Sequence, residues 1–389
     1  MKDRTLLMIP GPIEFEPAVL AALGGPTTAH TAPGFIDVFG QALERMREIC
    51  MAPSSQPFII SGSGTLAMEI AAANLVEPGD NVLVVSTGYF GNRYEEILRR
   101  YGAAVTNIRA AAGDIIDPDK VEIILKGGTF KLMTFTHVDT STAVLVDPKV
   151  MAKLGKKYGV LTVLDGVCSV GGEEIQQEKW GIDVVLTASQ KAIGVPPGLA
   201  LLTVSPKAMS VWRRRNTPVG NYYADWKNWL PIMEAYEARK PSYFATPPVN
   251  HICALNVSLG QILAEGMEAR FARHRKISTA CKSAVAGLGL KQVPSDQGHS
   301  ASTMTAPYYP EGVKGSELLA RIKDAGVVLA GGLHPDIKAS YFRIGHMGAI
   351  APADILAVVG AIETGLRACG YKFKLGVGLT AAQRVLAGK

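Results

Sequence analysis

The stretch Leu186-Thr-Ala-Ser-Gln-Lys-Ala192 decides the fold that we expect of this 389-residue chain. It begins inside an apolar run, residues 184–187, which is typical of a buried strand, and it contains a single lysine, Lys191. Residues 193–198, with two glycines and two prolines, indicate a loop. Ligands of open α/β sheets bind beyond the carboxyl ends of the strands. Lys191 is therefore a candidate reactive amine, although a lysine taken alone more often points into solvent.

Short apolar segments alternate with helical segments around this stretch. The periodicity predicts helices at 36–51, 65–76, 92–101 and 148–158. It predicts strands at 57–60, 81–85, 105–108, 131–136, 161–164, 184–187 and 199–203. This repetition favours an α/β fold with a mostly parallel sheet that is covered by helices on both faces.

The pattern changes after residue 205. Residues 221–243 are rich in Trp and Tyr and weakly periodic, which predicts a loop region or an interface. Helices at 249–265, 270–287 and 353–368, the last of them the final helix, and strands near Thr303 and Val327 then indicate a smaller α+β unit. We expect an N-terminal arm at 1–20, a large domain at 21–260 and a small C-terminal domain at 261–389.

Composition excludes several classes of protein. The chain is 48% hydrophobic and 19% charged with a net charge of +6, which is typical of a globular protein and suits small anionic ligands. Its basic clusters lack interleaved aromatics, so we expect no nucleic-acid partner, and no apolar run is long enough to span a membrane. Five scattered cysteines without a C-x-x-C pair argue against a disulfide framework and a metal site. No signal-peptide pattern is present, so a cytoplasmic location is expected.

Polar and aromatic residues follow the other predicted strands. Residues 61–65, Ser-Gly-Ser-Gly-Thr, precede a helix and suit an anion, although an ordinary turn or N-cap has the same composition. Asp165 ends the strand one strand–helix–strand unit before Lys191, and a buried carboxylate needs a cationic partner. Phe90 follows another predicted strand, is flanked by glycines and can stack on a planar ligand or pack in the core, and Thr140 offers a hydroxyl.

One cofactor uses an anion cradle, a stacking aromatic, a carboxylate and a primary amine together, namely pyridoxal 5′-phosphate (PLP). Its aldehyde forms a Schiff base with the amine, and the carboxylate keeps the ring nitrogen protonated so that the ring accepts electrons. The lysine that substrate releases then transfers the proton. The sequence thus predicts a PLP enzyme in which Lys191 and Asp165 carry the chemistry.

These residues resemble the class V aminotransferases of PLP fold type I, in particular the alanine–glyoxylate, serine–glyoxylate and serine–pyruvate group. The resemblance covers almost the whole chain. It depends on a set of motifs at residues 9–12 (IPGP), 61–64 (SGSG), 137–142 (HVDTST), 164–169 (LDGVCS), 188–192 (ASQKA), 243–248 (YFATPP) and 343–348 (RIGHMG). It implies a large domain with a mostly parallel sheet and a smaller α+β C-terminal domain.

The resemblance also implies a role for each matching residue. Lys191 would carry the Schiff base and Asp165 would pair with the pyridinium. Phe90 would stack on the ring where many relatives have Trp, and Thr140 would bond its phenolic oxygen where relatives often have Ser. The phosphate would be held by Ser63, Gly64, Thr65 (a His in several relatives) and Gln190, with Tyr243 and Thr246 reaching it across a homodimer interface, while Arg343 would bind the substrate carboxylate and Gly11 would line the substrate pocket.

The implied activity is transfer of the amino group of a small L-amino acid, alanine or serine, to glyoxylate or pyruvate by a ping-pong mechanism. Pyridoxamine–pyruvate transfer, 3-hydroxykynurenine transamination and a lyase reaction remain as alternatives within the family. No G-x-G-x-x-G motif follows the first predicted strand of this chain, which argues against a dinucleotide-binding dehydrogenase. A non-catalytic binding protein with the same fold is a further alternative, and the function of such a protein would not require Lys191. The donor, the pathway and any assembly beyond a dimer are not determined by the sequence.

Overall fold

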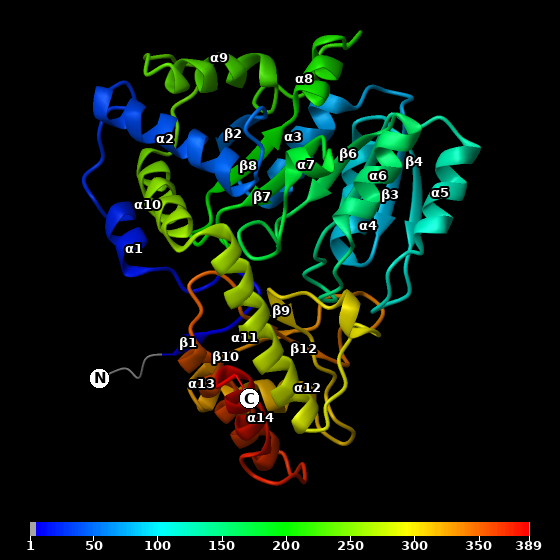
Figure 1. The fold of residues 1–389 in the computed structure, drawn as a ribbon, viewed down its shortest axis with the longest axis vertical. Helices are drawn as coiled ribbons and strands as arrows, with labels where there is room; N and C mark the ends of the chain where they lie inside the picture. The colour runs from blue at the N-terminus through cyan, green and yellow to red at the C-terminus, as the bar shows by residue number, and fades with distance from the viewer. Residues whose placement is uncertain (1–4, 389) are drawn as a thin grey trace.

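A seven-stranded sheet forms the centre of the larger part of the molecule (Figure 1). The structure is a computed structural model that describes residues 5–388. The strands are β2 (Gln56–Ser61), β3 (Asn81–Ser86), β4 (Ala104–Arg109), β5 (Leu132–Thr136), β6 (Leu161–Asp165), β7 (Val184–Ala188) and β8 (Leu199–Val204). Their order is β2-β8-β7-β6-β5-β3-β4, and only β8 runs antiparallel to its neighbours. The predicted mostly parallel sheet is confirmed.

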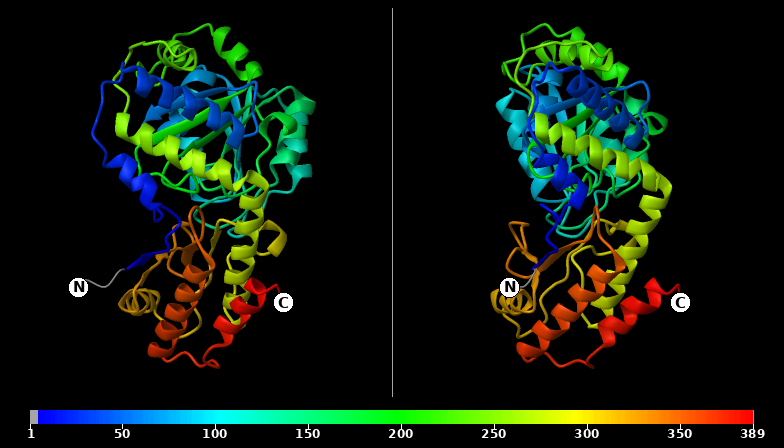
Figure 2. Two further views of the ribbon diagram at one scale, coloured as in Figure 1. Left: turned by 60° about the vertical axis from the view of Figure 1, so that its left-hand side comes forward. Right: turned by 90° about the vertical axis from the view of Figure 1, so that its left-hand side faces the viewer.

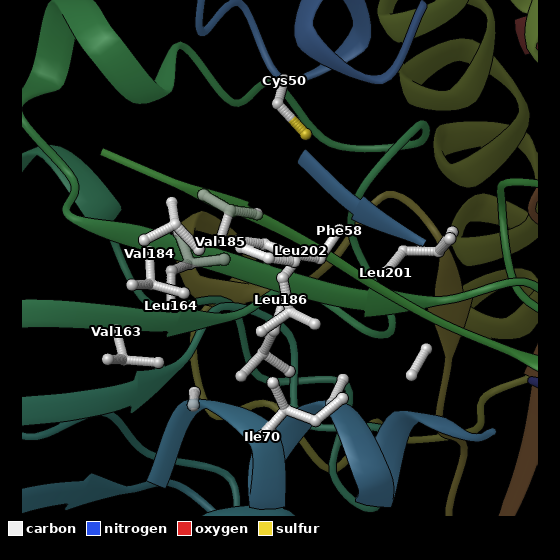
Figure 3. Packing of buried hydrophobic residues seen from close by; sticks show 14 of the residues in the cluster. Cys50, Phe58, Ile70, Val163, Leu164, Val184, Val185, Leu186, Leu201 and Leu202 are labelled. Carbon is white, nitrogen blue, oxygen red and sulfur yellow. The ribbon is translucent and has the colours of Figure 1, made fainter. Parts of the chain in front are cut away.

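Helices enclose this sheet. They are α1 (Pro17–Leu23), α2 (Pro33–Ile49), α3 (Gly64–Leu75), α4 (Tyr89–Arg100), α5 (Pro118–Gly127), α6 (Pro148–Tyr158), α7 (Gln177–Trp180), α8 (Pro206–Arg213), α9 (Trp226–Glu237) and α10 (Val249–Glu265). Every residue of β6, β7 and β8 is buried, as expected for strands that helices cover on both faces. Figure 3 shows part of this packing, with Ile70 of α3 directed toward Leu186 of β7.

Helix α6 shows how local sequence sets the helix limits. The side chain of Asp147 accepts a hydrogen bond from the Lys149 amide, and Pro148 occupies the first helical position. At the other end, Gly159 adopts a φ of 70°, a left-handed conformation that glycine adopts without steric cost. Both predicted limits of this helix are confirmed.

The prediction of a loop region at 221–243 is wrong where residues 226–237 form α9. Its buried residues repeat at helical spacing and are Trp226, Trp229, Ile232, Met233 and Tyr236. Pro231 lies inside the helix, where it removes one backbone hydrogen bond. A proline within a run of bulky aromatics concealed the helical period.

The C-terminal part forms a second hydrophobic cluster, separate from that around the large sheet. Its helices are α11 (Met267–Gly287), the 3₁₀ turn Gln297–His299, α12 (Gly315–Asp324), α13 (Pro352–Ala368) and α14 (Val377–Leu386). Its short strands are β9 (Met304–Thr305), β10 (Val327–Val328), β11 (Ala330–Gly331) and β12 (Phe342–Gly345), and β1 (Leu6–Leu7) from the N-terminal arm pairs with β10. Figure 2 shows α11 running from the large part into this smaller one.

The expectation that the helix ending near residue 368 is the last one is wrong, because α14 follows and packs on α11. Gly378 in the first turn lowers the helix propensity of that segment, so tertiary contacts stabilise it. The domain boundaries at residues 20 and 260 stay a prediction. Among the helices of residues 5–388, none is both long and apolar enough to cross a lipid bilayer.

Candidate active site

The carboxyl ends of six strands lie at one edge of the large sheet. Because β8 alone is reversed, β2, β3, β4, β5, β6 and β7 all end on the same side. Register pairs Thr136 with Asp165 and Asp165 with Leu186, so the residues after β5, β6 and β7 begin next to one another. The residues that follow these strands and that the sequence singled out are Ser63, Gly64, Thr65, Phe90, Thr140, Asp165, Gln190 and Lys191.

Lys191 is buried, with 7% of its surface exposed, and its ammonium donates to the carbonyl oxygen of Pro10. Burial lowers the pKa of Lys191, and the charge of Arg343 lowers it further, while Cys168 and Asp165 act in the opposite direction. A lysine whose pKa is lowered has more of the neutral amine that acts as nucleophile or base. Pro10 belongs to the N-terminal arm and Arg343 to the smaller part of the molecule, so both of these parts reach the amine of Lys191.

Gly11 lies against this lysine. Its φ is 108°, and a Cβ placed there would lie 2.6 Å from Lys191 Nζ. A side chain at this position therefore strains the backbone and displaces the amine at once.

We expect Gly11→Ala to lower activity by about tenfold or more, because a displaced reactive group loses its productive geometry. It should also lower the free energy of unfolding by about 1–3 kcal/mol. The control is Gly79→Ala, since Gly79 has a φ of 90° but no atom within 4 Å of its added Cβ. Steady-state rates and thermal melts of both variants separate backbone strain from displacement of Lys191, and equal activities in the two would contradict this interpretation.

Asp165 is buried at the end of β6, where one of its carboxylate oxygens accepts from the Val167 amide at 3.1 Å. Burial raises its pKa to about 7, and the carboxylate of Asp139 raises it further, whereas the Val167 hydrogen bond and the charges of Arg93 and Lys191 lower it. Across residues 5–388 the Val167 amide is its only hydrogen-bond donor. A buried carboxylate with so few donors has free lone pairs for a cationic N–H, which suits a protonated ring nitrogen.

The N-terminus of α3 forms the candidate anion cradle. Ser63 is its N-cap and accepts from the Leu66 amide at 3.4 Å. Gly64 approaches the loop after β6 closely, since a Cβ there would lie 2.9 Å from a methyl group of Val167. The buried Oε1 of Gln190 has no hydrogen-bond partner in the described chain, and its amide can rotate to present N–H donors. These residues fit a phosphate group.

Two elements complete the site from either side. Phe90 lies in the first turn of α4, which begins at Tyr89, three residues before the start predicted at residue 92, and its amide donates to Asp139 Oδ2 at 3.1 Å. Arg343 on β12 donates from Nε to the Gly331 carbonyl at 2.8 Å and from Nη1 to the Thr140 carbonyl at 3.1 Å. Arg343 therefore joins the small part of the molecule to the loop after β5, beside the amine of Lys191.

Tyr243 and Thr246 lie outside this constellation. Both are exposed, Tyr243 to 64%, and its ring contacts His30 with centroids 5.3 Å apart. No hydrogen bond in the described part of the chain joins either residue to Ser63, Gly64 or Thr65.

Sequence reasoning missed two charged residues of the site, Asp139 and Arg93. Asp139 is fully buried and accepts from the Phe90 amide and from the amide and hydroxyl of Ser141. Its position after an apolar strand was a usable signal, whereas Arg93 lies on a helix surface and gave none. Residues 5–388 contain no group of three or more His, Cys, Asp or Glu side chains placed to hold a metal ion.

The candidate site combines a buried amine, a buried carboxylate and an anion cradle at the carboxyl edge of an α/β sheet, which is the set of groups that the sequence predicted for a PLP enzyme. The chain matches the family model described as Aminotransferase class-V over residues 21–347, and it belongs to that family. The predicted resemblance to class V aminotransferases, with fold type I architecture and transaminase activity, is therefore confirmed.

Named relatives differ in the substrates that their names give. Alanine–glyoxylate aminotransferase 1 of Saccharomyces cerevisiae is 43% identical over 365 residues, covering 90% of this chain and 94% of the relative. L-aspartate–glyoxylate aminotransferase of Paracoccus denitrificans is 31% identical, covering 98% and 96%. The crystal structure of pyridoxamine–pyruvate aminotransferase from Mesorhizobium loti superposes with a TM-score of 0.93 at 28% identity, covering 99% of this chain and 98% of that one.

Proposed function

We propose that this protein is a PLP-dependent aminotransferase that moves the amino group of a small L-amino acid, alanine or serine, to glyoxylate or pyruvate. The observation that carries the proposal is the juxtaposition of Lys191, Asp165 and Arg343, each buried or partly buried, at one edge of the sheet. A free amine, an anion and a carboxylate-binding guanidinium are the three groups that amino transfer from an α-amino acid needs.

Each residue has a definite task in this proposal. PLP, when bound, supplies an electron sink for bond cleavage at the donor Cα. Lys191 would hold the cofactor through its amine and, once free, carry the proton between carbon atoms of the reacting groups. Asp165 would hold a proton on the ring nitrogen, and Phe90 and Thr140 would fix the ring. Arg343 would bind the substrate carboxylate with its planar fork, for which lysine is no substitute.

The cradle supports a phosphorylated cofactor. Ser63, Gly64, Thr65 and Gln190 would hold the phosphate at the N-terminus of α3, where backbone N–H groups and the helix dipole favour an anion. Pyridoxamine–pyruvate transfer, in which a pyridoxal-type compound is the substrate, stays the second candidate because of the close structural similarity reported above.

The names of the relatives include alanine, serine and aspartate donors. Gly11 adds no side chain to the wall of the site beside the amine, so a short donor side chain fits there without displacing Lys191.

We also propose a homodimer in which Tyr243 and Thr246 of the partner subunit reach the cofactor phosphate. Their exposure, and the lack of a hydrogen bond from either residue to the cradle of its own chain within residues 5–388, support this arrangement. Tyr222, with 78% of its surface exposed, lies in the same aromatic region and is suited to an interface.

The test is a half-reaction with the purified, PLP-loaded protein. Addition of L-alanine or L-serine alone should bleach the visible absorbance of the bound cofactor, and glyoxylate or pyruvate should restore it. L-aspartate and pyridoxamine complete the panel. Absence of bleaching with every amino acid, together with turnover of pyridoxamine and pyruvate without bound PLP, would overturn the proposal in favour of the second candidate.

A further inference from the structure

Arg93 on α4 connects three parts of the candidate site. Its Nη1 donates to Thr65 Oγ1 at 3.0 Å, and its guanidinium carbon lies 4.9 Å from the ring centre of Phe90 and 5.0 Å from that of Tyr89. Both distances are within the range of cation–π interactions. No carboxylate of residues 5–388 lies within ion-pair distance of this guanidinium.

The hydrogen bond to Thr65 determines what that hydroxyl does. A threonine hydroxyl has one proton to donate and two lone pairs to accept with. Because a guanidinium can only donate, its bond to Thr65 Oγ1 uses a lone pair and leaves the hydroxyl proton free for an anion in the cradle. The positive charge on the accepting side strengthens that donation, as in charge-assisted hydrogen bonds.

The other groups assigned to the phosphate are neutral. Ser63, Gly64, Thr65 and Gln190 carry no charge, so only the dipole of α3 would balance a phosphate from within the chain. Arg93 forms no ion pair with a carboxylate in the described chain and brings a positive charge to the cradle through its hydrogen bond with Thr65.

We propose that Arg93 is a positioning residue that makes the site select a phosphorylated cofactor, by orienting and polarising the Thr65 hydroxyl. This inference depends on the proposed PLP site and extends it to a residue outside the sequence motifs. The effect of Arg93 on Asp165, which it acts to keep ionised, is a second consequence of the same placement.

The test compares PLP with pyridoxal, which lacks the phosphate, as ligands of the apoprotein. We expect Arg93→Gln to weaken PLP binding by about 10- to 100-fold while pyridoxal binding changes less than about threefold, the range of one charge-assisted interaction. Arg93→Lys should recover part of the loss. Arg99→Gln is the matched control, because Arg99 is an exposed arginine of the same helix paired with Glu95. Equal weakening of both ligands would show a merely structural role and overturn the inference.

A double-mutant cycle with Thr65→Val tests the route of the effect. If Arg93 acts through the Thr65 hydroxyl, the double variant should bind PLP no more than about threefold more weakly than the weaker-binding single variant. If the double variant instead lost PLP affinity by the product of the two single-variant losses, Arg93 would not act through the Thr65 hydroxyl. If Arg93→Gln does not fold, the ratio of PLP affinity to pyridoxal affinity can be measured in Arg93→Lys and Thr65→Val instead. Failure of wild-type protein to bind PLP would refute the proposed function itself, whereas an unchanged PLP-to-pyridoxal ratio in Arg93→Gln would refute only this inference.

Discussion

Lys191→Ala is expected to lower the rate of amino transfer by at least about 10⁴-fold, because it removes both the covalent attachment point and the proton carrier. The burial of the amine and its lowered pKa favour those roles. Because a buried ammonium destabilises the folded state, its removal should leave the variant folded. Steady-state rates with alanine and glyoxylate, together with thermal melts, measure the two effects separately.

Two further measurements make the result specific. Borohydride reduction of the loaded wild-type protein, followed by peptide mapping, should find the cofactor on Lys191 and on no other lysine. Lys191→Met keeps most of the side-chain length without the amine and should be as inactive as the alanine variant. Methylamine should restore part of the activity of Lys191→Ala, since it replaces the missing base. An alanine variant that retains a tenth or more of the wild-type rate would contradict the assignment.

The position of Lys191 could be predicted because it depends on simple regularities. A run of apolar residues followed by a loop marks a strand end, and parallel strands place their ends at one edge of the sheet. Asp165 and Thr140 follow from the same rule, and the structure brings them to that edge. Arg343 was found only through the family resemblance, because a strand of four residues in a small α+β unit has little periodicity.

Arg93 and helix α9 were out of reach for different reasons. Arg93 belongs to an amphipathic helix with several other arginines, and its contact with Thr65 joins residues 28 positions apart in the chain. No local pattern distinguishes it from Arg99 or Arg100, which face solvent. Helix α9 has a helical burial pattern, but Pro231 and the density of aromatics favoured a loop. Patterns in the local sequence therefore predicted where strands end. They did not predict the contact of Arg93 on α4 with Thr65 on α3.

Asp165→Asn is expected to reduce activity by about 10²- to 10³-fold, the range for loss of a preorganised charge at a reaction centre. It is also expected to stabilise the apoprotein near pH 8. The folded-state pKa of Asp165 is about 7, whereas an aspartate in an unfolded chain titrates near about 4. The folded protein therefore binds the proton more tightly, and stability falls as pH rises between these two values. Above pH 7 the full cost, at most about 4 kcal/mol, is present.

The neutral amide of asparagine escapes this cost and still accepts from the Val167 amide. We expect the apo variant to unfold at a temperature a few degrees above wild type at pH 8, because it no longer buries a charge; the lost attraction of Asp165 to Arg93 and Lys191 limits this gain. The difference should shrink at pH 5, where wild-type Asp165 is protonated in the folded state.

Asp183→Asn is the matched control, since Asp183 is a buried aspartate that accepts from the amide and hydroxyl of Thr162 and pairs with Lys207. Removing its charge should lower the melting temperature at both pH values, because its existing partners lose a charged acceptor. An Asp165→Asn apoprotein less stable than wild type at pH 8 would show that the carboxylate already has its counter-ion within the fold. The carboxylate of Asp165 would then not be available to pair with a protonated ring nitrogen. Gain of stability together with loss of activity is the pattern of a charge kept for function at the expense of the fold.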